Sequence, residues 1–465
     1  MAVSSIVAAA PASYLRGLMR RLWGSLSAIV AARDERARAQ RNAAYAFLVR
    51  VISAGLLYLS QVVLARWMGS HEYGIYVFVW TWVIVLGGIS NLGMPVVMMR
   101  LMPEYVVQGE HARMRGLLRF GQRSALVSSS AFAGAAALGV WALGSHANSH
   151  YLLPALLAMA CVPMFALSEI LDGIGRSRGW MSVGLLPPYV LRPSLLLAFM
   201  AVGYGMGWPM DARSAVISAI AATWLTALAQ WLLLNLAFRA EIGSGPVQSE
   251  GRTWLLAGLP LLVVTVSDLA LQTGDVLILS AFLPPSDVGM YFAAAKTMSL
   301  ISFVHYAVGS AIANRLSSLR AQGDAEGLAA LVRDAVAWTF WPSLAGALAI
   351  LAMGKPLLWL FSPAFTEAYP VMAVLAIGLL ARASVGPAET VLNLLGQQRM
   401  TALILMTSAI TGLGLGLVLV PLVGMLGAAA ATSTACTLAA LASAIVARRR
   451  LGLDISIVGA LRAAR

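Results

Sequence analysis

The chain has 465 residues, of which 60% are hydrophobic and only 11% are charged. Soluble globular proteins carry about 25% charged residues, and the mean hydropathy of +0.82 is typical of a chain that folds in lipid. This composition excludes a cytosolic enzyme, a secreted disulfide-stabilised domain and a disordered regulator. The net charge is +13, from 32 basic and 19 acidic residues. Cys161 and Cys436 lie in separate apolar stretches, so we expect no disulfide framework and no paired-cysteine metal site.

A helix needs about 20 apolar residues to cross the hydrocarbon core of a membrane. Such stretches predict twelve spans, at 43–65, 75–97, 121–144, 151–171, 183–204, 214–238, 254–282, 289–313, 335–353, 370–395, 400–420 and 424–447. The sequence therefore predicts an all-α polytopic membrane protein. The seventh stretch is long, and we expect it to be tilted or broken near Thr273 and Gly274. The partly apolar stretch 354–369 leaves the choice between 12 and 14 spans open.

The distribution of basic residues predicts the orientation of the chain. If the N-terminus lies inside, the inner segments hold 25 of the 32 Lys and Arg residues and the outer segments hold 3. This positive-inside bias predicts that both termini are cytoplasmic, and it explains the basic excess without a nucleic-acid partner. We interpret residues 1–42 as a basic cytoplasmic tail, which either carries a helix on the anionic inner leaflet or has no fixed structure.

The two halves of the chain share short motifs at a nearly constant offset. The Gly-Ile-Tyr motif at 74–76 matches Gly-Met-Tyr at 289–291, and the motif at 171–178 matches that at 392–399, at offsets of 215 and 221. Six spans per half make the repeats parallel, as in secondary transporters that rock two bundles around a central site. The predicted domains are two six-helix bundles at 43–238 and 253–447, a cytoplasmic linker at 239–252 and a basic cytoplasmic tail at 448–465.

Several motifs resemble those of polysaccharide flippases in the multidrug/oligosaccharidyl-lipid/polysaccharide (MOP) exporter superfamily. They are Leu-Ala-Arg-Trp-Met-Gly at 64–69 with Tyr-Gly-x-Tyr at 73–76, Asn-Leu-Gly-Met-Pro at 91–95, Pro-Glu-Tyr at 103–105, Gly-Leu-Pro at 258–260 and Asp-Val-Leu-Ile-Leu at 275–279. The resemblance covers residues 43–447. It implies a two-bundle fold and an O-antigen or exopolysaccharide flippase for lipopolysaccharide or related surface polysaccharides. Such proteins move polyprenyl-diphosphate-linked glycans across the bacterial inner membrane. Twelve spans rather than fourteen argue against the lipid II flippase branch.

Charged residues inside the predicted spans are the candidate site, because a charge at mid-bilayer costs about 2.5–3.5 kcal/mol. Asp275 and Lys296 lie equally far from the loop between the seventh and eighth spans, which predicts that they are level and form an ion pair. Asp268 precedes Asp275 by seven residues and shares its helix face. Arg50 lies roughly 10 Å into the first span, where it either projects into a cavity or extends back to the headgroups.

For the other candidates, a structural role competes with a functional one. Arg192, between prolines, is either held by freed carbonyl groups or lines the cavity, and Arg382 and Glu389 either pair or bind substrate. His305 is favoured as a hydrogen-bonded core residue over a proton-transfer group. The aromatic residues Tyr76, Trp80 and Trp82 either stack on sugar rings or form an interfacial belt. Arg66, Arg100 and Arg315, at span ends, are expected to contact headgroups or to act as gates between the halves.

No catalytic motif is present: the chain has no GxxxxGK loop, no HExxH and no Gly-x-Ser-x-Gly elbow with triad partners. We therefore expect no enzymatic activity, no metal and no cofactor. The predicted function is alternating-access flipping of a lipid-linked oligosaccharide. Arg50 and Lys296 are expected to attract the diphosphate, while Asp268 and Asp275 either bind a coupling ion, H⁺ or Na⁺, or exchange partners between states. Membrane lipids and a polysaccharide polymerase are the further expected partners. A cation-coupled multidrug exporter of the same superfamily and a membrane polysaccharide polymerase are the alternatives.

Overall fold

The computed structural model describes residues 35–142 and 149–463, and every regular element in these ranges is a helix. Helices dominate because a chain in lipid must satisfy its backbone polar groups within each segment. The prediction of an all-α polytopic membrane protein is confirmed. The helix considered for residues 1–42 falls largely outside the described residues.

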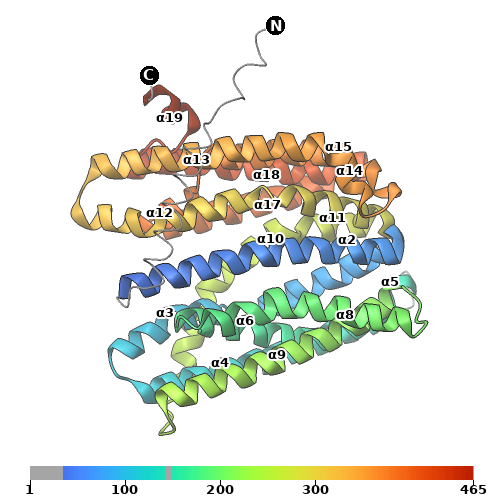
Figure 1. Ribbon diagram of the computed structural model, residues 1–465, viewed down its shortest axis with the longest axis horizontal. Helices are drawn as coiled ribbons and strands as arrows, with labels where there is room; N and C mark the ends of the chain where they lie inside the picture. Colours follow the sequence, from blue (N-terminus) through green and yellow to red (C-terminus); the bar gives the residue numbers. More distant parts are fainter. Residues whose placement is uncertain (1–34, 143–148, 464–465) are drawn as a thin grey trace, which may run out of the picture.

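The first half of the chain forms the lower group of helices in Figure 1. Its elements are α2 (Glu35–Ser90), α3 (Met94–Val107), α4 (His111–Ala142), α5 (Ser149–Ala158), η1 (Met159–Cys161), α6 (Val162–Ser177), α7 (Met181–Leu186), η2 (Pro187–Leu191), α8 (Arg192–Gly205) and α9 (Ala212–Ile242). The short turns η1 and η2 continue the helices on either side of them, so α5–α6 and α7–α8 each form one span.

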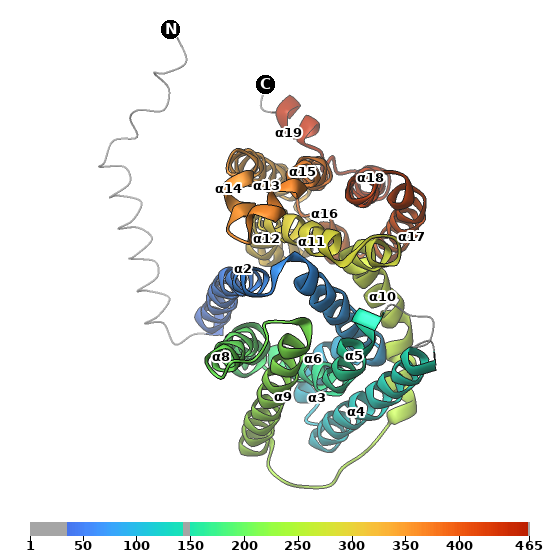
Figure 2. The same cartoon turned by 90° about the vertical axis from the view of Figure 1, so that its right-hand side faces the viewer.

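The second half forms the upper group. Its elements are α10 (Gly251–Phe282), α11 (Pro285–Ser299), α12 (Ser302–Gln322), α13 (Ala325–Ala352), α14 (Gly354–Trp359), η3 (Pro363–Ala368), α15 (Tyr369–Ala383), α16 (Ala388–Leu394), α17 (Gln398–Val423), α18 (Met425–Val446), η4 (Ala447–Leu451) and α19 (Ile457–Ala463). Figure 2 shows the same two groups along the helix axes.

Within the described residues, ten helical segments are long and apolar enough to cross a membrane, against twelve predicted spans. Two features explain the difference. The first two predicted spans are merged in α2, whose segment Ile52–Ser90 counts once. The predicted eighth span, 289–313, is divided between α11 and α12 and is not among the ten.

The two arms of α2 meet at Gly69, where the chain reverses direction without a loop (Figure 1). Gly69 has φ 76° and ψ 171°, a backbone conformation that is open to glycine and strained for other residues. The resemblance motif at 64–69 therefore ends at the residue that makes the bend. The bend and α14 lie at one end of the molecule, on the right of Figure 1. The turns at 107–111 and 322–325 lie at the opposite end, which we call the basic end because the predicted inner segments meet there.

Each half has a buried core of its own near the basic end. In the first half, Met94, Met102 and Leu117 pack together, and in the second half Leu316 and Val332 belong to a separate core. A third and larger core contains residues of both halves. The first of these cores also contains Trp254, from beyond the predicted linker, so the division at 239–252 stays a prediction.

Helix α10 connects the two groups and is continuous from Gly251 to Phe282. The predicted break near Thr273 and Gly274 is therefore wrong, whereas the helix does run obliquely in Figures 1 and 2. Gly274 lies within the continuous helix, where it allows α17 to pack closely. A Cβ at this position would lie 2.5 Å from the Leu413 side chain of α17.

The beginning of α10 and the linker before it are anchored to the first half. The Trp254 side chain is fully buried, and its indole N–H donates to the Tyr105 hydroxyl of α3 at 3.0 Å. In the linker, the Pro246 carbonyl accepts from Arg115 Nε at 2.9 Å. Arg113 Nε lies 2.8 Å from Glu250 Oε1. The first turn of α10 thus packs with the bundle that precedes it in the sequence.

This anchor predicts the effect of truncating Trp254. We expect Trp254→Ala to destabilise the protein by about 3–5 kcal/mol, because it removes a large buried side chain and leaves the Tyr105 hydroxyl without its donor. Thermal unfolding of the purified protein in detergent measures the change. Trp338→Ala is the matched control, because Trp338 is 55% exposed. Equal melting temperatures for the two variants would contradict the assigned anchor.

Candidate functional site

At the end that carries the Gly69 bend, the two halves meet through the glycines of the repeated motif. A Cβ at Gly74 of α2 would collide with the Pro285 carbonyl at the start of α11, and a Cβ at Gly289 would lie 2.7 Å from the Ser70 carbonyl oxygen. The two backbones are therefore in direct contact. Because the same motif supplies both glycines, the internal repeat places equivalent residues of the two halves against each other.

Aromatic side chains fill the space around this contact. The Tyr73 ring is completely buried, with its centroid 6.3 Å from that of Phe292 and 6.0 Å from that of Phe365. Its hydroxyl donates to Gln61 Oε1 at 2.8 Å. The Tyr58 ring meets Phe361 edge to face at 5.7 Å. We call this the sealed end, because a buried aromatic cluster and a glycine contact close it between the halves.

Of the three predicted gate arginines, only Arg66 lies at the sealed end. Its guanidinium lies 5.4 Å from the centre of the Trp359 ring, and Nη1 donates to the Leu360 carbonyl at 3.4 Å, so it joins α2 to the chain after α14. Arg100 is exposed and lies 4.0 Å from Glu104 of its own helix. Arg315 is exposed on α12. In the described part of the chain, neither Arg100 nor Arg315 forms an ion pair with the other half.

A second line of contact between the halves runs along α2 and α10. A Cβ at Gly88 of α2 would lie 2.5 Å from the Leu269 side chain of α10, so the two helices pack closely there. Toward the basic end, Gly93 and Gly258 approach so closely that a Cβ on either would collide with backbone. Contact between the halves therefore exists at the sealed end and along one side of the interface.

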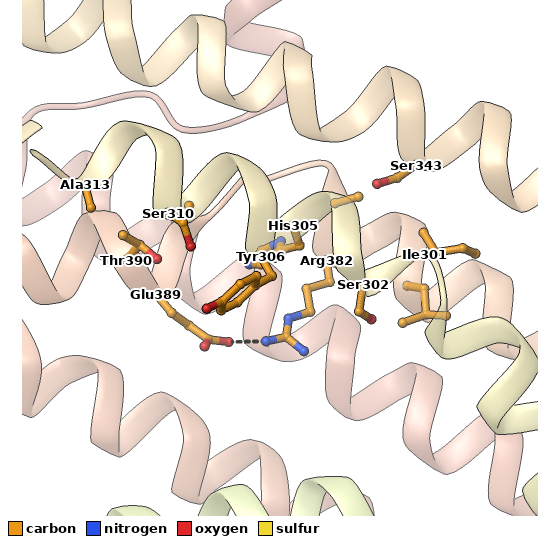
Figure 3. Close-up of a pocket in the computed structure, with 13 residues that line it drawn as sticks. Ile301, Ser302, His305, Tyr306, Ser310, Ala313, Ser343, Arg382, Glu389 and Thr390 are labelled. Atoms are coloured by element: carbon orange, nitrogen blue, oxygen red, sulfur yellow. Dashed lines mark hydrogen bonds and ion pairs between the residues drawn. The ribbon is translucent and has the colours of Figure 1, made fainter. Parts of the chain in front are cut away.

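The main cavity has a volume of about 430 Å³ and lies in the second half (Figure 3). Its wall contains an ion pair, with Arg382 Nη2 2.7 Å from Glu389 Oε1, and both side chains are about 40% exposed. His305 and Tyr306 extend from α12 toward this pair (Figure 3). The predicted pairing of Arg382 with Glu389 thus occurs directly, at the cavity surface, and His305 lies in the cavity wall.

Sequence reasoning missed the hydroxyl groups of this cavity. Ser302, Ser310, Ser343 and Thr390 line it together with Tyr306. A signal was available, because 302, 306 and 310 recur at helical spacing in an otherwise apolar stretch. Their hydroxyls both donate and accept hydrogen bonds, which suits the recognition of uncharged polar groups.

The two acids of α10 have different surroundings. Asp268 is exposed, accepts from Gln272 Nε2 at 2.6 Å, and interacts electrostatically with the Arg382–Glu389 pair. Asp275 accepts from the Tyr291 hydroxyl at 2.7 Å and lines a much smaller cavity between α10, α17 and α18. The predicted acidic stripe therefore has one exposed member, Asp268, and one member, Asp275, that is half-buried between helices.

The predicted ion pair between Asp275 and Lys296 is absent from the described residues. The two residues interact electrostatically, but the Tyr291 hydroxyl of α11 occupies the Asp275 carboxylate instead. Lys296 is exposed, and its ammonium lies 5.0 Å from the centre of the Phe292 ring on the same helix. Counting residues from the loop placed the two residues near enough to interact electrostatically. It could not predict the direction of each side chain, which decides whether an ion pair forms.

Arg192 lies in the first half, away from the main cavity. Its guanidinium lies 5.0 Å from the centre of the Phe165 ring and 5.7 Å from that of Trp80. The Tyr76 ring stacks on Trp80 at 6.2 Å but is only 2% exposed, so it belongs to the core rather than to a sugar-binding surface. The side chain of Arg50 lies outside the described residues, although the backbone of α2 passes through this position.

Comparison with known proteins gives a family and a fold. The family model of polysaccharide biosynthesis proteins matches residues 39–317. No curated protein sequence matches the chain. An inward-facing multidrug resistance MATE family transporter of the MOP superfamily is similar over 90% of this chain and 100% of its own, with a TM-score of 0.71 and 13% identity.

Two further solved structures share the fold. An outward-facing MATE family transporter matches 92% of this chain and 97% of its own, with a TM-score of 0.60 and 14% identity. The lipid II flippase MurJ, in an inward closed conformation, matches 89% and 90% respectively, with a TM-score of 0.67 and 13% identity. The fold is therefore that of MATE and MurJ proteins, which confirms the two-bundle class.

The glycine contact predicts that a side chain at position 74 holds the sealed end open. We expect Gly74→Leu to separate the halves there, because a backbone carbonyl of Pro285 cannot rotate aside as a side chain can. Spin labels at His71 and Glu367, with Cys161 and Cys436 replaced by alanine, report this distance by double electron–electron resonance. The distribution should shift to longer distances.

Gly55→Leu is the matched control for this prediction, because it lies on the same helix and a Cβ there would meet nothing within 4 Å. It should leave the distance distribution unchanged. A wild-type distribution for Gly74→Leu would show that the contact does not hold this end together.

Proposed function

Because the chain belongs to the polysaccharide biosynthesis protein family, we propose that it flips a polyprenyl-diphosphate-linked oligosaccharide across the bacterial inner membrane. The proposed mechanism is alternating access, with both termini in the cytoplasm. The observation that carries the proposal is a cavity of about 430 Å³ that contains an ion pair and several hydroxyl groups, inside a membrane-spanning bundle, combined with a sealed opposite end. The higher similarity to the inward-facing than to the outward-facing MATE structure supports access from the basic end.

The proposed glycan site is the main cavity. Its hydroxyl groups and the exposed Tyr306 ring suit sugars, which offer many hydroxyls and an apolar ring face. The Arg382–Glu389 pair presents both a donor and an acceptor while its charges compensate each other. This balance favours an uncharged glycan over a strongly charged one at this place.

The proposed diphosphate site is Lys296. Its ammonium is exposed, and no carboxylate of the described residues lies within ion-pair distance of it, so its positive charge is available. Arg50 stays a predicted second ligand on the facing arm of α2. Ile52 and Leu59 of that arm are more than half exposed and offer an apolar surface beside which the polyprenyl tail lies in the proposed mechanism.

Asp268 and Asp275 are the proposed sites for a coupling ion, H⁺ or Na⁺. Ionisable groups within spans are costly and commonly mark ion pathways. Asp275 supports this role through its position in a small enclosed cavity beside Tyr291. Asp268 supports it through its interaction with the ion pair of the main cavity.

A multidrug exporter is the second candidate function. The high TM-score to a multidrug resistance MATE family transporter favours it. The two functions differ in their cargo. An exporter protects cells against several unrelated drugs, whereas loss of a flippase stops surface polysaccharide formation.

Depletion of the protein distinguishes these functions. We expect mass spectrometry of membranes from depleted cells to show accumulation of one complete, unpolymerised, polyprenyl-linked repeat unit, together with loss of surface polysaccharide. Re-expression of Lys296→Arg should restore the wild-type level, whereas Lys296→Gln should leave flux at least about tenfold lower, because it lacks the charge that attracts a diphosphate. Lys355→Gln, at the sealed end, is the matched control and should complement fully. An unchanged lipid-linked pool in depleted cells would overturn the flippase proposal.

The coupling role predicts a specific defect for Asp275→Asn. The asparagine side chain of this variant still accepts a hydrogen bond from the Tyr291 hydroxyl, but it has no negative charge to bind Na⁺ and cannot bind or release a proton. We expect transport by the reconstituted variant to become independent of the imposed proton and sodium gradients. Wild-type dependence on either gradient would remove Asp275 from the coupling mechanism.

A further inference from the structure

The C-terminal tail encloses a second pocket, which is separate from the site described above. It has a volume of about 390 Å³ and lies at the basic end. One wall is α13, through Val332 and Arg333, and the other is the tail after α18, through Leu453, Asp454 and Arg462. Figure 1 shows α19, the last element of this tail, above α13 on the outer side of the second half.

The tail is fixed in place, so the pocket is part of the fold. Leu453 and Ile455 are buried in the core of the second half, together with Val332 of α13. The backbone N–H of Ile457 donates to the Ser384 carbonyl, at the end of α15, at 2.8 Å. These contacts hold Arg462 of α19 in the lining of the same pocket as Arg333 of α13.

Positive charge is in excess around this pocket. Arg333 and Arg462 are exposed, and neither forms an ion pair within the part of the chain that the structure describes. The lining contains one acid, Asp454. Burial alone would raise the pKa of its carboxyl, but the hydrogen bonds from the Ser456 hydroxyl and N–H, with the charges of Arg448 and Arg462, lower it overall. Asp454 is therefore ionised, and its Oδ1 already accepts from the Ser456 hydroxyl at 2.6 Å.

The pocket lies where the neighbouring helices leave the hydrocarbon. The predicted ninth span, 335–353, begins two residues after Arg333, and the twelfth, 424–447, ends directly before Arg448. Further along α13, Trp338 and Trp341 are each more than half exposed and face away from the core. An arginine-lined pocket with an exposed apolar and aromatic helix face beside it combines the features that bind a lipid headgroup and its acyl chains.

We propose that this pocket binds the phosphate group of an anionic phospholipid, held between the guanidinium groups of Arg333 and Arg462. The planar donor fork of arginine matches phosphate oxygens. The acyl chains lie along the exposed face of α13. The bound lipid joins the C-terminal tail to α13, and this role is independent of the cargo that the protein transports.

Native mass spectrometry of the full-length protein tests this proposal. The protein is released from nanodiscs that contain phosphatidylglycerol or cardiolipin, and in parallel from nanodiscs that contain phosphatidylcholine alone. We expect the wild type to retain an anionic lipid but no phosphatidylcholine. The double variant Arg333→Gln/Arg462→Gln should bind phosphatidylglycerol at least about tenfold more weakly, since each arginine near the surface contributes to anionic-lipid binding.

The matched control is Arg239→Gln/Arg252→Gln, which removes the same charge from exposed positions at the two ends of the predicted cytoplasmic linker, 239–252. It should retain lipid as the wild type does. Equal loss from both double variants would reduce the effect to general charge and overturn the site. Displacement of the lipid by millimolar inorganic phosphate would identify free phosphate as the occupant and overturn the lipid assignment. Unchanged melting temperatures in detergent show that both variants remain folded, because the replaced side chains are exposed.

Discussion

Backbone contact between Gly74 of α2 and Gly289 of α11 holds the two halves together at one end of the protein, and the other features of the interface depend on it. Without side chains at these two positions, the helices approach closely enough for Tyr58, Tyr73, Phe292 and Phe365 to pack as one cluster. Small residues allow such close approach because packing rather than hydrophobic burial drives helix association in lipid. In the proposed mechanism, this closed end shields the polar groups of the main cavity from that side of the membrane.

The ionisable groups of the spans are arranged so that few of them are isolated. Arg382 pairs with Glu389, Asp275 accepts from Tyr291, and Asp268 accepts from Gln272. Each partner lowers the cost of placing a charge in a low-dielectric environment. Lys296 differs, because it forms no ion pair with the described residues, and its attraction to the Phe292 ring, 5.0 Å away, does not use the ammonium hydrogens. This difference is the reason why we propose Lys296 as the ligand of the diphosphate.

Sequence patterns predicted the fold class well because length and hydropathy determine where a helix crosses a membrane. The internal repeat went further, since it identified Gly74 and Gly289 as equivalent positions before their contact was known. The spans at 43–65 and 75–97 predicted a turn between them, but not that both arms would stay helical up to Gly69, because the polar residues around this glycine are typical of a loop. The site was predicted in part. Charged residues within spans are conspicuous, which identified Arg382, Glu389 and Asp268. The depth of a residue in the membrane does not determine the direction of its side chain. The predicted partner of Asp275 was therefore Lys296, whereas the structure has Tyr291.

The anchoring of Trp254 has a mechanical consequence for α10. Its first turn is fixed to the first half through Tyr105, whereas Gly274, five turns later, packs against Leu413 of the second half. One continuous helix is thus clamped at both ends to different bodies. Any rotation of one half against the other must therefore bend or twist α10 between these clamps. Because Gly258 and Leu269 of α10 also contact Gly93 and Gly88 of the first half, the elastic strain of such a rotation concentrates between Leu269 and Gly274.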